Sequence, residues 1–400
     1  MANMVFSATI GAVLALMLIF SVSIDATTST QNIFCTTDDE RNHPILCHML
    51  QLVEEDPRGM ADYLYQHAQE NKWLVGHDWS DDSEFGKMSS SVVASTMSRQ
   101  LLRSSSSKDD NALPIVFAHG MGDSCFNSGM QSITKKAGEM MGVYSVCIPT
   151  GKDQSEDTNN GFFLNMDATV DVFAEAVQND PKLQNGFNAI GFSQGNNVIR
   201  GYIAKYNTGT AVVNAFLSIN GVNAGEGAVP HCNPSLSKSP FAQKLRFDVC
   251  ELLMEQASRA AYTDFAQQHS FQANYWRDPR PSAFPRYQQY AQLAKWNNEA
   301  GFVNQTLKDN WAKTNTFVWV LATEDGMVFP REGEWWQSPD PNDPYHSVLP
   351  MKETEWYTKD LFGLKTADEA GKNHFEKFEG DHLQFSMEDF ERWIKEYFGK

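Results

Sequence analysis

Three side chains of the sequence have the types and the order that nucleophilic hydrolysis requires. Ser193 is the central residue of the segment 191–195, G-F-S-Q-G, which is a G-x-S-x-G pattern. The residues before it, 187–192, predict a short buried strand, and residues 196–206 predict a helix with one apolar face. A serine on such a strand-to-helix turn is held above a sheet with its hydroxyl exposed, so the pattern predicts a serine nucleophile.

A serine hydroxyl is a poor nucleophile unless a histidine removes its proton and a carboxylate orients that histidine. In serine hydrolases with a parallel α/β sheet, the chain order is serine, acid, histidine. Asp325 follows an apolar segment, 317–322, that predicts a strand, and His382 lies in a polar turn before a predicted helix at 386–397. We therefore expect Asp325 to be the acid and His382 the base.

Other residues compete for these roles. Glu324 is a rival acid, and Asp325 is also compatible with an ordinary turn. Asp381 has the position of a helix cap or of a residue that supports the site. Three other histidines lie near plausible loops, namely His119, His346 and His374. The chain order favours Asp325 and His382 over these rivals.

The tetrahedral intermediate of acyl transfer needs two backbone N–H donors. One comes from the residue after the nucleophile, Gln194. The other comes from the loop after an early strand, and residues 119–122, H-G-M-G, have that position. We expect the N–H of Met121 to be the second donor. The start of the predicted helix after Ser193 adds a positive partial charge at the same place.

Strands and helices alternate along the part of the chain that carries these residues. Predicted strands lie at 114–118, 143–148, 187–192, 211–219 and 317–322, and predicted helices at 128–141, 168–178, 196–206 and 386–397. This alternation predicts an α/β fold, with a mostly parallel central sheet flanked by helices. Residues 235–313 contain no convincing strand and many aromatic residues, so they predict a helical cap inserted into a catalytic domain at 113–400.

The N-terminal part of the chain has a different character. Residues 1–26 predict a signal peptide cleaved near Ser23 or Ala26, although no Lys or Arg precedes the apolar run, which leaves an uncleaved signal anchor as the alternative. Residues 27–88 predict an acidic helical extension, and residues 89–112 a serine-rich linker. The extension is either a propeptide or an interaction module.

Cysteines and one sequon agree with a secreted chain. Six cysteines allow 15 disulfide pairings. Cys35 with Cys47 and Cys232 with Cys250 are the local choices, which leaves Cys125 with Cys147, unless some of them are buried thiols. Asn304 begins the one N-x-S/T sequon and predicts a glycosylation site.

Composition excludes some partners. The net charge of −18 argues against nucleic acid or an anionic membrane as a partner, and it also favours solubility. No C-x-x-C pair is present, so a structural zinc site is not expected. We expect the chain to need neither a metal ion nor a cofactor.

Several further segments of the chain have a distinctive sequence. They lie at 119–125 (HGMGDSC), 162–165 (FFLN), 180–184 (DPKLQ), 188–195, 275–276 with 278–279, 357–365 and 379–384 (EGDHLQ). In these segments and in their order, the sequence from about residue 113 to 398 closely resembles the lysosomal palmitoyl-protein thioesterases of the first type. The chain departs from the family at Phe126, where the family has a second cysteine. It also departs at Asn196, where the family tends to have a glycine.

The resemblance implies an α/β-hydrolase that cleaves palmitoyl groups from the cysteines of S-acylated proteins or peptides in the lysosome or vacuole, or after secretion. It implies Ser193, Asp325 and His382 as the triad, and Met121 and Gln194 as the oxyanion donors. It also matches the pair Cys232 and Cys250 and the sequon at Asn304. The alternatives are a secreted carboxylester lipase or esterase, and a non-catalytic hydrolase-like binding protein.

Overall fold

The computed structural model describes residues 112–229 and 254–399 of the chain. The predicted signal peptide, the extension and the linker up to residue 111 lie outside the described residues, and so do Cys35, Cys47, Cys232 and Cys250. Among the described residues, no helix has both the length and the apolar composition that are needed to cross a bilayer.

Six parallel strands form the central sheet, in the order β2-β1-β3-β4-β5-β8. The strands are β1 (Ile115–Ala118), β2 (Ser145–Cys147), β3 (Phe187–Phe192), β4 (Val213–Ile219), β5 (Thr316–Ala322) and β8 (Asn373–Phe378). The predicted α/β fold with a parallel sheet is thereby confirmed. The sequence analysis did not predict β8, because this edge strand carries mostly polar and half-buried residues.

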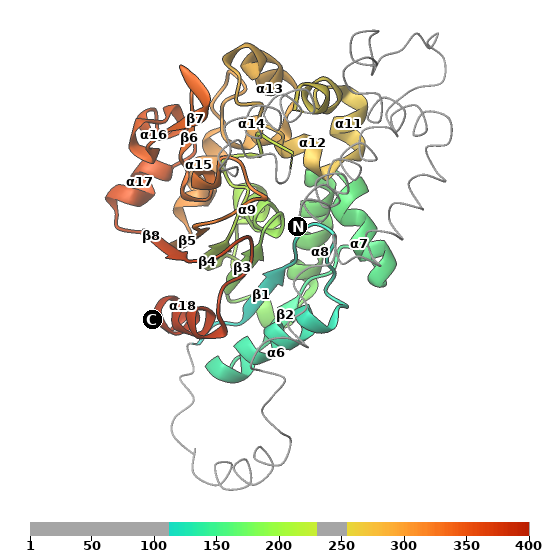
Figure 1. The fold of residues 1–400 in the computed structure, drawn as a ribbon. Helices are drawn as coiled ribbons and strands as arrows, with labels where there is room; N and C mark the ends of the chain where they lie inside the picture. Colours follow the sequence, from blue (N-terminus) through green and yellow to red (C-terminus); the bar gives the residue numbers. More distant parts are fainter. Residues whose placement is uncertain (1–111, 230–253, 400) are drawn as a thin grey trace, which may run out of the picture.

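Helices cover both faces of the sheet (Figure 1). One face carries α8 (Met166–Asn179), α9 (Gly195–Tyr206) and α15 (Gln305–Ala312), and the other carries α6 (Ser128–Met141) and α18 (Met387–Phe398). Successive side chains of a strand point to opposite faces, and the two apolar cores divide accordingly. In β1, for example, Val116 belongs to the core under α8 and α9, and Phe117 to the core under α6 and α18.

The predicted cap is helical in its described part. It contains α11 (Asp264–His269), α12 (Phe271–Tyr275), α13 (Phe284–Tyr290) and α14 (Gln292–Trp296), which lie together in Figure 1. Its backbone meets the segment after β4 through one isolated bridge, between Glu226 and Trp276.

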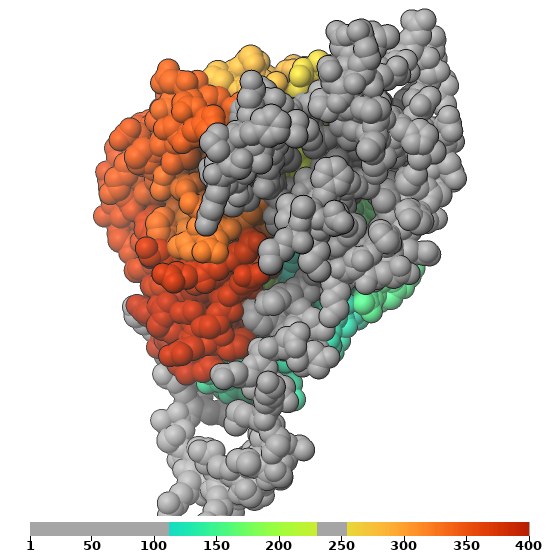
Figure 2. All heavy atoms as spheres, in the orientation of Figure 1, coloured from blue at the N-terminus to red at the C-terminus, as the bar shows by residue number. Residues whose placement is uncertain are grey.

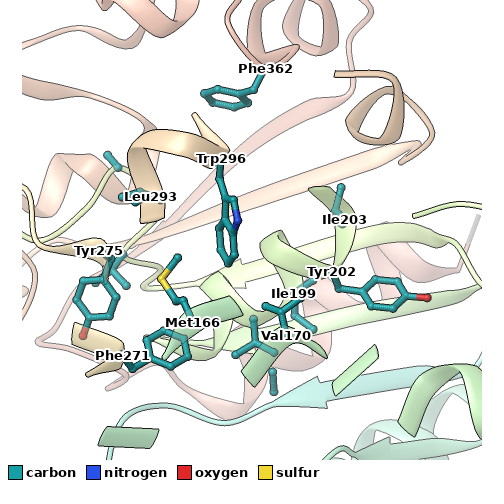
Figure 3. Packing of buried hydrophobic residues seen from close by; sticks show 14 of the residues in the cluster. Met166, Val170, Ile199, Tyr202, Ile203, Phe271, Tyr275, Leu293, Trp296 and Phe362 are labelled. Carbon is teal, nitrogen blue, oxygen red and sulfur yellow. The ribbon is translucent and has the colours of Figure 1, made fainter. Parts of the chain in front are cut away.

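One continuous core joins these helices to the body of the protein (Figure 3). Trp296 of α14 points toward α9, where a Cβ on Gly201 would collide with its ring. α15 belongs to the helix layer on the sheet, because Asn310 donates a hydrogen bond to the Ala204 carbonyl of α9 at 2.9 Å. The insertion predicted at 235–313 thus includes one helix, α15, that packs against α9.

The remaining elements are small. They include α7 (Gln154–Phe163), α16 (Glu355–Thr358), α17 (Leu364–Glu369), several short 3-10 helices, and an antiparallel hairpin of β6 (Ser338–Asp340) and β7 (Asp343–Leu349). On the face drawn in Figure 2, the C-terminal part of the chain, in orange and red, forms one continuous surface. The segments after β3, β5 and β8 carry Ser193, Asp325 and His382, respectively.

Candidate active site

Ser193 occupies a strained turn between β3 and α9. Its φ is +51°, in the left-handed region that residues other than glycine rarely adopt. The neighbouring glycines are required by close contacts, because a Cβ on Gly191 would collide with Asn196, and one on Gly195 with the Ala118 carbonyl oxygen. The Asn196 amide donates to the Ser193 and Ile219 carbonyl oxygens, both at 2.9 Å, and so stabilises the turn.

His382 lies between the serine and a buried carboxyl group. Its Nε2 is 2.8 Å from the Ser193 Oγ, and its Nδ1 is 2.6 Å from the Asp325 Oδ2. Asp325 is fully buried, and its Oδ1 accepts the N–H groups of Met327 at 2.7 Å and Val328 at 2.9 Å. The arrangement lets the imidazole take the serine proton, while a fixed carboxylate stabilises the resulting imidazolium.

Asp325 keeps its negative charge in spite of its burial. Burial by itself raises the pKa of this carboxyl group, but the adjacent His382 imidazole and the hydrogen bonds to the carboxyl lower it by more. The pKa of Asp325 therefore lies below its ordinary value.

The two backbone N–H groups that the sequence analysis expected as oxyanion donors belong to Gln194, which follows Ser193, and to Met121, in the loop after β1. In the described part of the chain, no protein acceptor is bonded to the N–H of Gln194 or to that of Met121. Gln194 is the N-cap residue of α9. The loop that carries Met121 passes close to Ser193, since a Cβ on Gly120 would lie 3.3 Å from the Ser193 Cβ.

A buried ion pair between His119 and Asp157 stabilises the loop that carries Met121. The His119 Nε2 lies 3.2 Å from the Asp157 Oδ1, and the His119 Nδ1 lies 2.9 Å from the Gly120 carbonyl oxygen. Burial lowers the pKa of His119, but Asp157, the Gly120 carbonyl and Asp123 together raise it by more, so the net shift is upward. Burial likewise opposes ionisation of Asp157, but His119 and further hydrogen bonds lower the pKa of Asp157 to about 2.

A disulfide lies at the end of the same loop. Cys125 and Cys147 are bonded, with their Cα atoms 5.5 Å apart, which confirms the third predicted pair. The Cys125 N–H also donates to Asp157 at 2.9 Å. The bond joins the segment after β1 to the end of β2.

The side chain of Gln194 is bonded to the predicted cap. Its Oε1 accepts from the Gln272 amide at 2.6 Å and from the Tyr275 hydroxyl at 3.1 Å, both on α12. Its Nε2 donates to the Gly161 carbonyl at 2.7 Å. The sequence analysis missed Gln272, because no motif marks an interior glutamine that bonds another glutamine 78 positions away.

The residues that competed for the roles of acid and base have other surroundings. Glu324 is exposed, and His346 is an exposed residue beside Asp343. His374 lies on β8, with its ring tilted against that of Tyr397 on α18 at 5.0 Å. Asp381 supports the site, since it accepts the Gly326 N–H at 2.8 Å. The sequence analysis also missed Glu334, a fully buried carboxyl group near Asp325, because it follows Asp325 by nine positions without any recognisable pattern.

Two groups of described residues have side chains close enough to share a metal ion. One is His119, Cys125 and Asp157, and the other is Asp325, Glu334 and His382. In the first group the Cys125 sulfur is already part of a disulfide. In the second, the His382 Nδ1 and the Asp325 Oδ2 are bonded to each other at 2.6 Å, a contact that an ion would have to replace.

The sequence matches one known protein family and several of its members. The sequence model of the family described as palmitoyl protein thioesterase matches residues 114–382. Palmitoyl-protein thioesterase 1 of Caenorhabditis elegans is 33% identical over 278 residues, which cover 68% of this chain and 87% of that protein. Palmitoyl-protein thioesterase 3 of Dictyostelium discoideum is 29% identical over 290 residues, covering 71% and 89%.

More distant matches include lysosomal enzymes and other hydrolases. The human lysosomal thioesterase PPT2 is 26% identical over 173 residues, which cover 41% of this chain and 53% of that protein. Among solved structures, the type II thioesterase BorB from the borrelidin biosynthetic cluster matches with a TM-score of 0.36 at 12% identity. That match covers 74% of this chain and 96% of BorB.

Proposed function

This chain belongs to the palmitoyl protein thioesterase family and is a thioesterase, and from that premise we propose that Ser193, His382 and Asp325 carry out its reaction. The substrates are proteins or peptides with a long-chain acyl group, such as palmitate, on a cysteine. The observation that carries this assignment is the continuous chain of contacts from the Ser193 Oγ through His382 to the ionised Asp325.

In the first half of the reaction, the Ser193 Oγ attacks the carbonyl carbon of the thioester while His382 Nε2 takes the serine proton. The negative charge that develops on the carbonyl oxygen is stabilised by the N–H groups of Met121 and Gln194. Collapse of the tetrahedral intermediate breaks the C–S bond. The cysteine sulfur leaves with the proton from His382, and the acyl group stays on Ser193 as an ester.

In the second half, His382 takes a proton from a water molecule, which attacks the acyl ester. The same two N–H groups stabilise the second oxyanion. Collapse breaks the bond to the Ser193 Oγ, which recovers its proton from His382, and the fatty acid is released. Asp325 stays ionised throughout and stabilises the imidazolium in both halves.

The proposed thioesterase differs from an oxygen-ester hydrolase in the leaving atom, which is the cysteine sulfur and not an alcohol oxygen. A triad acts on either ester, so the test compares a palmitoyl-cysteine peptide with the same peptide carrying palmitoyl-serine. We expect faster release of palmitate from the thioester, and loss of both activities in Ser193→Ala. A preference for the oxygen ester would indicate a lipase or esterase, and activity that survives in Ser193→Ala would remove the proposed nucleophile.

The proposed place of action is the lysosome or vacuole, reached through the secretory pathway. The predicted signal peptide and the name of the human relative support this proposal. Asn304 supports it too, because its side chain is exposed at the start of α15 and is accessible to a glycan. In cells, glycosidase treatment should shift the mobility of the full-length chain but not that of Asn304→Gln. A cytosolic protein without glycan would contradict the proposal.

A further inference from the structure

A second buried carboxyl group lies beside Asp325. Glu334 is fully buried on a short 3-10 turn, Arg331–Trp335. Its Oε2 accepts the Asn220 side-chain amide and the Ala322 N–H, both at 3.0 Å. Its Oε1 has no donor from any described residue. The carboxyl oxygens of Glu334 and Asp325 lie within 4.8 Å of each other and of a His382 ring nitrogen.

Two buried carboxyl groups this close to each other favour a state in which one of them holds a proton, because two negative charges side by side in a protein interior repel each other strongly. Asp325 accepts two backbone N–H groups and faces His382, so it is the better site for the charge. Burial, and after it the charge of Asp325, raises the pKa of Glu334 well above its ordinary value. The proton therefore belongs to Glu334.

We propose that Glu334 is a positioning residue of this thioesterase, whose neutral carboxyl group donates a hydrogen bond to Asp325 and extends the chain of contacts Ser193–His382–Asp325 by one member. The inference rests on the proposed triad. Glu334 also acts on the turn of the base, because Asn220, whose Nδ2 donates to Glu334, accepts the Leu383 N–H on its Oδ1 at 2.9 Å. One buried side chain thus contacts the acid and, through Asn220, the turn that carries the base.

Two substitutions separate this role from simple packing. In Glu334→Gln, the amide oxygen can still accept from Asn220 and Ala322, and the amide nitrogen can still donate to Asp325. In Glu334→Leu, both functions are lost. We expect kcat per active site to fall roughly 10–100-fold in the leucine variant, with KM unchanged, and the glutamine variant to recover most of that loss.

Glu226 provides a matched control. It is another buried carboxyl group, which accepts the Ala228 and Phe329 N–H groups at 3.0 Å, and the charge of Asp325 acts on it without a hydrogen bond between the two side chains. Glu226→Leu leaves two N–H donors without a partner, as Glu334→Leu does, so it should lose stability without losing kcat per active site. Active sites are counted by titration with a fluorophosphonate, which excludes unfolded protein from the comparison.

Infrared spectroscopy tests the proton itself and does not depend on the leucine variant being folded. The difference spectrum between wild type and Glu334→Gln should contain the C=O band of a protonated carboxylic acid that is present in wild type only. Absence of that band, or an unchanged kcat in folded Glu334→Leu, would overturn the inference. If Ser193→Ala kept its activity, the proposed function itself would fail, which is a different outcome from failure at Glu334 alone.

Discussion

The Gly326 N–H donates a hydrogen bond to the Asp381 Oδ1 at 2.8 Å, and the same oxygen accepts the His382 N–H at 2.7 Å. Gly326 follows Asp325 directly, and Asp381 precedes His382. A single carboxylate oxygen therefore joins the turn of the acid to the turn of the base, although 57 positions separate Asp325 from His382.

Asp381→Ala should release these two turns from each other. Since the imidazole must keep its place between Ser193 and Asp325, we expect kcat to fall about tenfold, with a smaller change in KM. The control is Glu379→Ala, which removes an exposed carboxylate two positions away and should leave kcat unchanged. Equal effects of the two variants on palmitoyl-cysteine hydrolysis would refute the role of Asp381.

The choice of Asp325 over Glu324 as the acid can be tested by neutralising each in turn. Asp325→Asn keeps the shape but loses the charge that stabilises the imidazolium, so kcat should fall by about 10³–10⁴-fold. Glu324→Gln changes an exposed side chain and should have little effect. Steady-state kinetics with the two purified variants measures both, and the reverse order of effects would assign the acid to Glu324.

The hydrogen bond from the Tyr275 hydroxyl to the Gln194 side chain predicts that this hydroxyl affects kcat, although it has no contact with the substrate in the proposed reaction. Tyr275→Phe removes one of the two donors to the Gln194 Oε1. We expect kcat to fall roughly threefold to tenfold, because the Gln194 N–H is then held less firmly in the oxyanion site. Tyr290→Phe, in the neighbouring α13, is the control, and a similar loss there would show that the effect is not specific to Gln194.

The buried pair His119–Asp157 predicts a pH-dependent stability. Because the pKa of His119 in the folded protein is raised above 6.5, its contribution is complete below that pH and is lost as the pH rises through the folded value. The Asp157 contribution behaves in the opposite way and is lost as the pH falls from 3.8 toward about 2.

His119→Gln should therefore lower the free energy of unfolding by about 1–3 kcal/mol near pH 5, with a smaller difference from wild type near pH 9. Urea unfolding at a series of pH values measures this difference. His346→Gln removes the exposed pair with Asp343 and should change stability by less than about 1 kcal/mol. A difference between wild type and His119→Gln that grows with pH would contradict the assigned sign.

Local patterns predicted the elements with strong periodicity. β3, α6 and α9 have the expected positions to within a residue, because buried strands and amphipathic helices leave clear apolar patterns. β8 and α7 were missed, because the first alternates weakly at a sheet edge and the second consists mainly of polar residues, Q-S-E-D-T-N-N. α7 is stabilised by polar contacts instead. The Asp153 side chain caps the helix by accepting the Glu156 N–H, and Asp157 accepts the Ser124 hydroxyl.

At the site, the serine turn, the acid and the base were accessible to prediction, since the chain order of such residues follows from the sheet topology. Glu334, Gln272 and Asp157 were not. Each of them acts through contacts with residues that are distant in the sequence or on another element, and such contacts exist only after folding. Their residue types are common, and no spacing distinguishes them from surface residues.

The most direct test of the account is to identify the residue that becomes covalently modified. The protein is allowed to react with a fluorophosphonate that carries a long alkyl chain, and the modified peptide is mapped by mass spectrometry. The account predicts one adduct, on Ser193, which forms much more slowly in Asp325→Asn and in His382→Ala. An adduct on another residue, or the same rate of labelling in all three proteins, would contradict it.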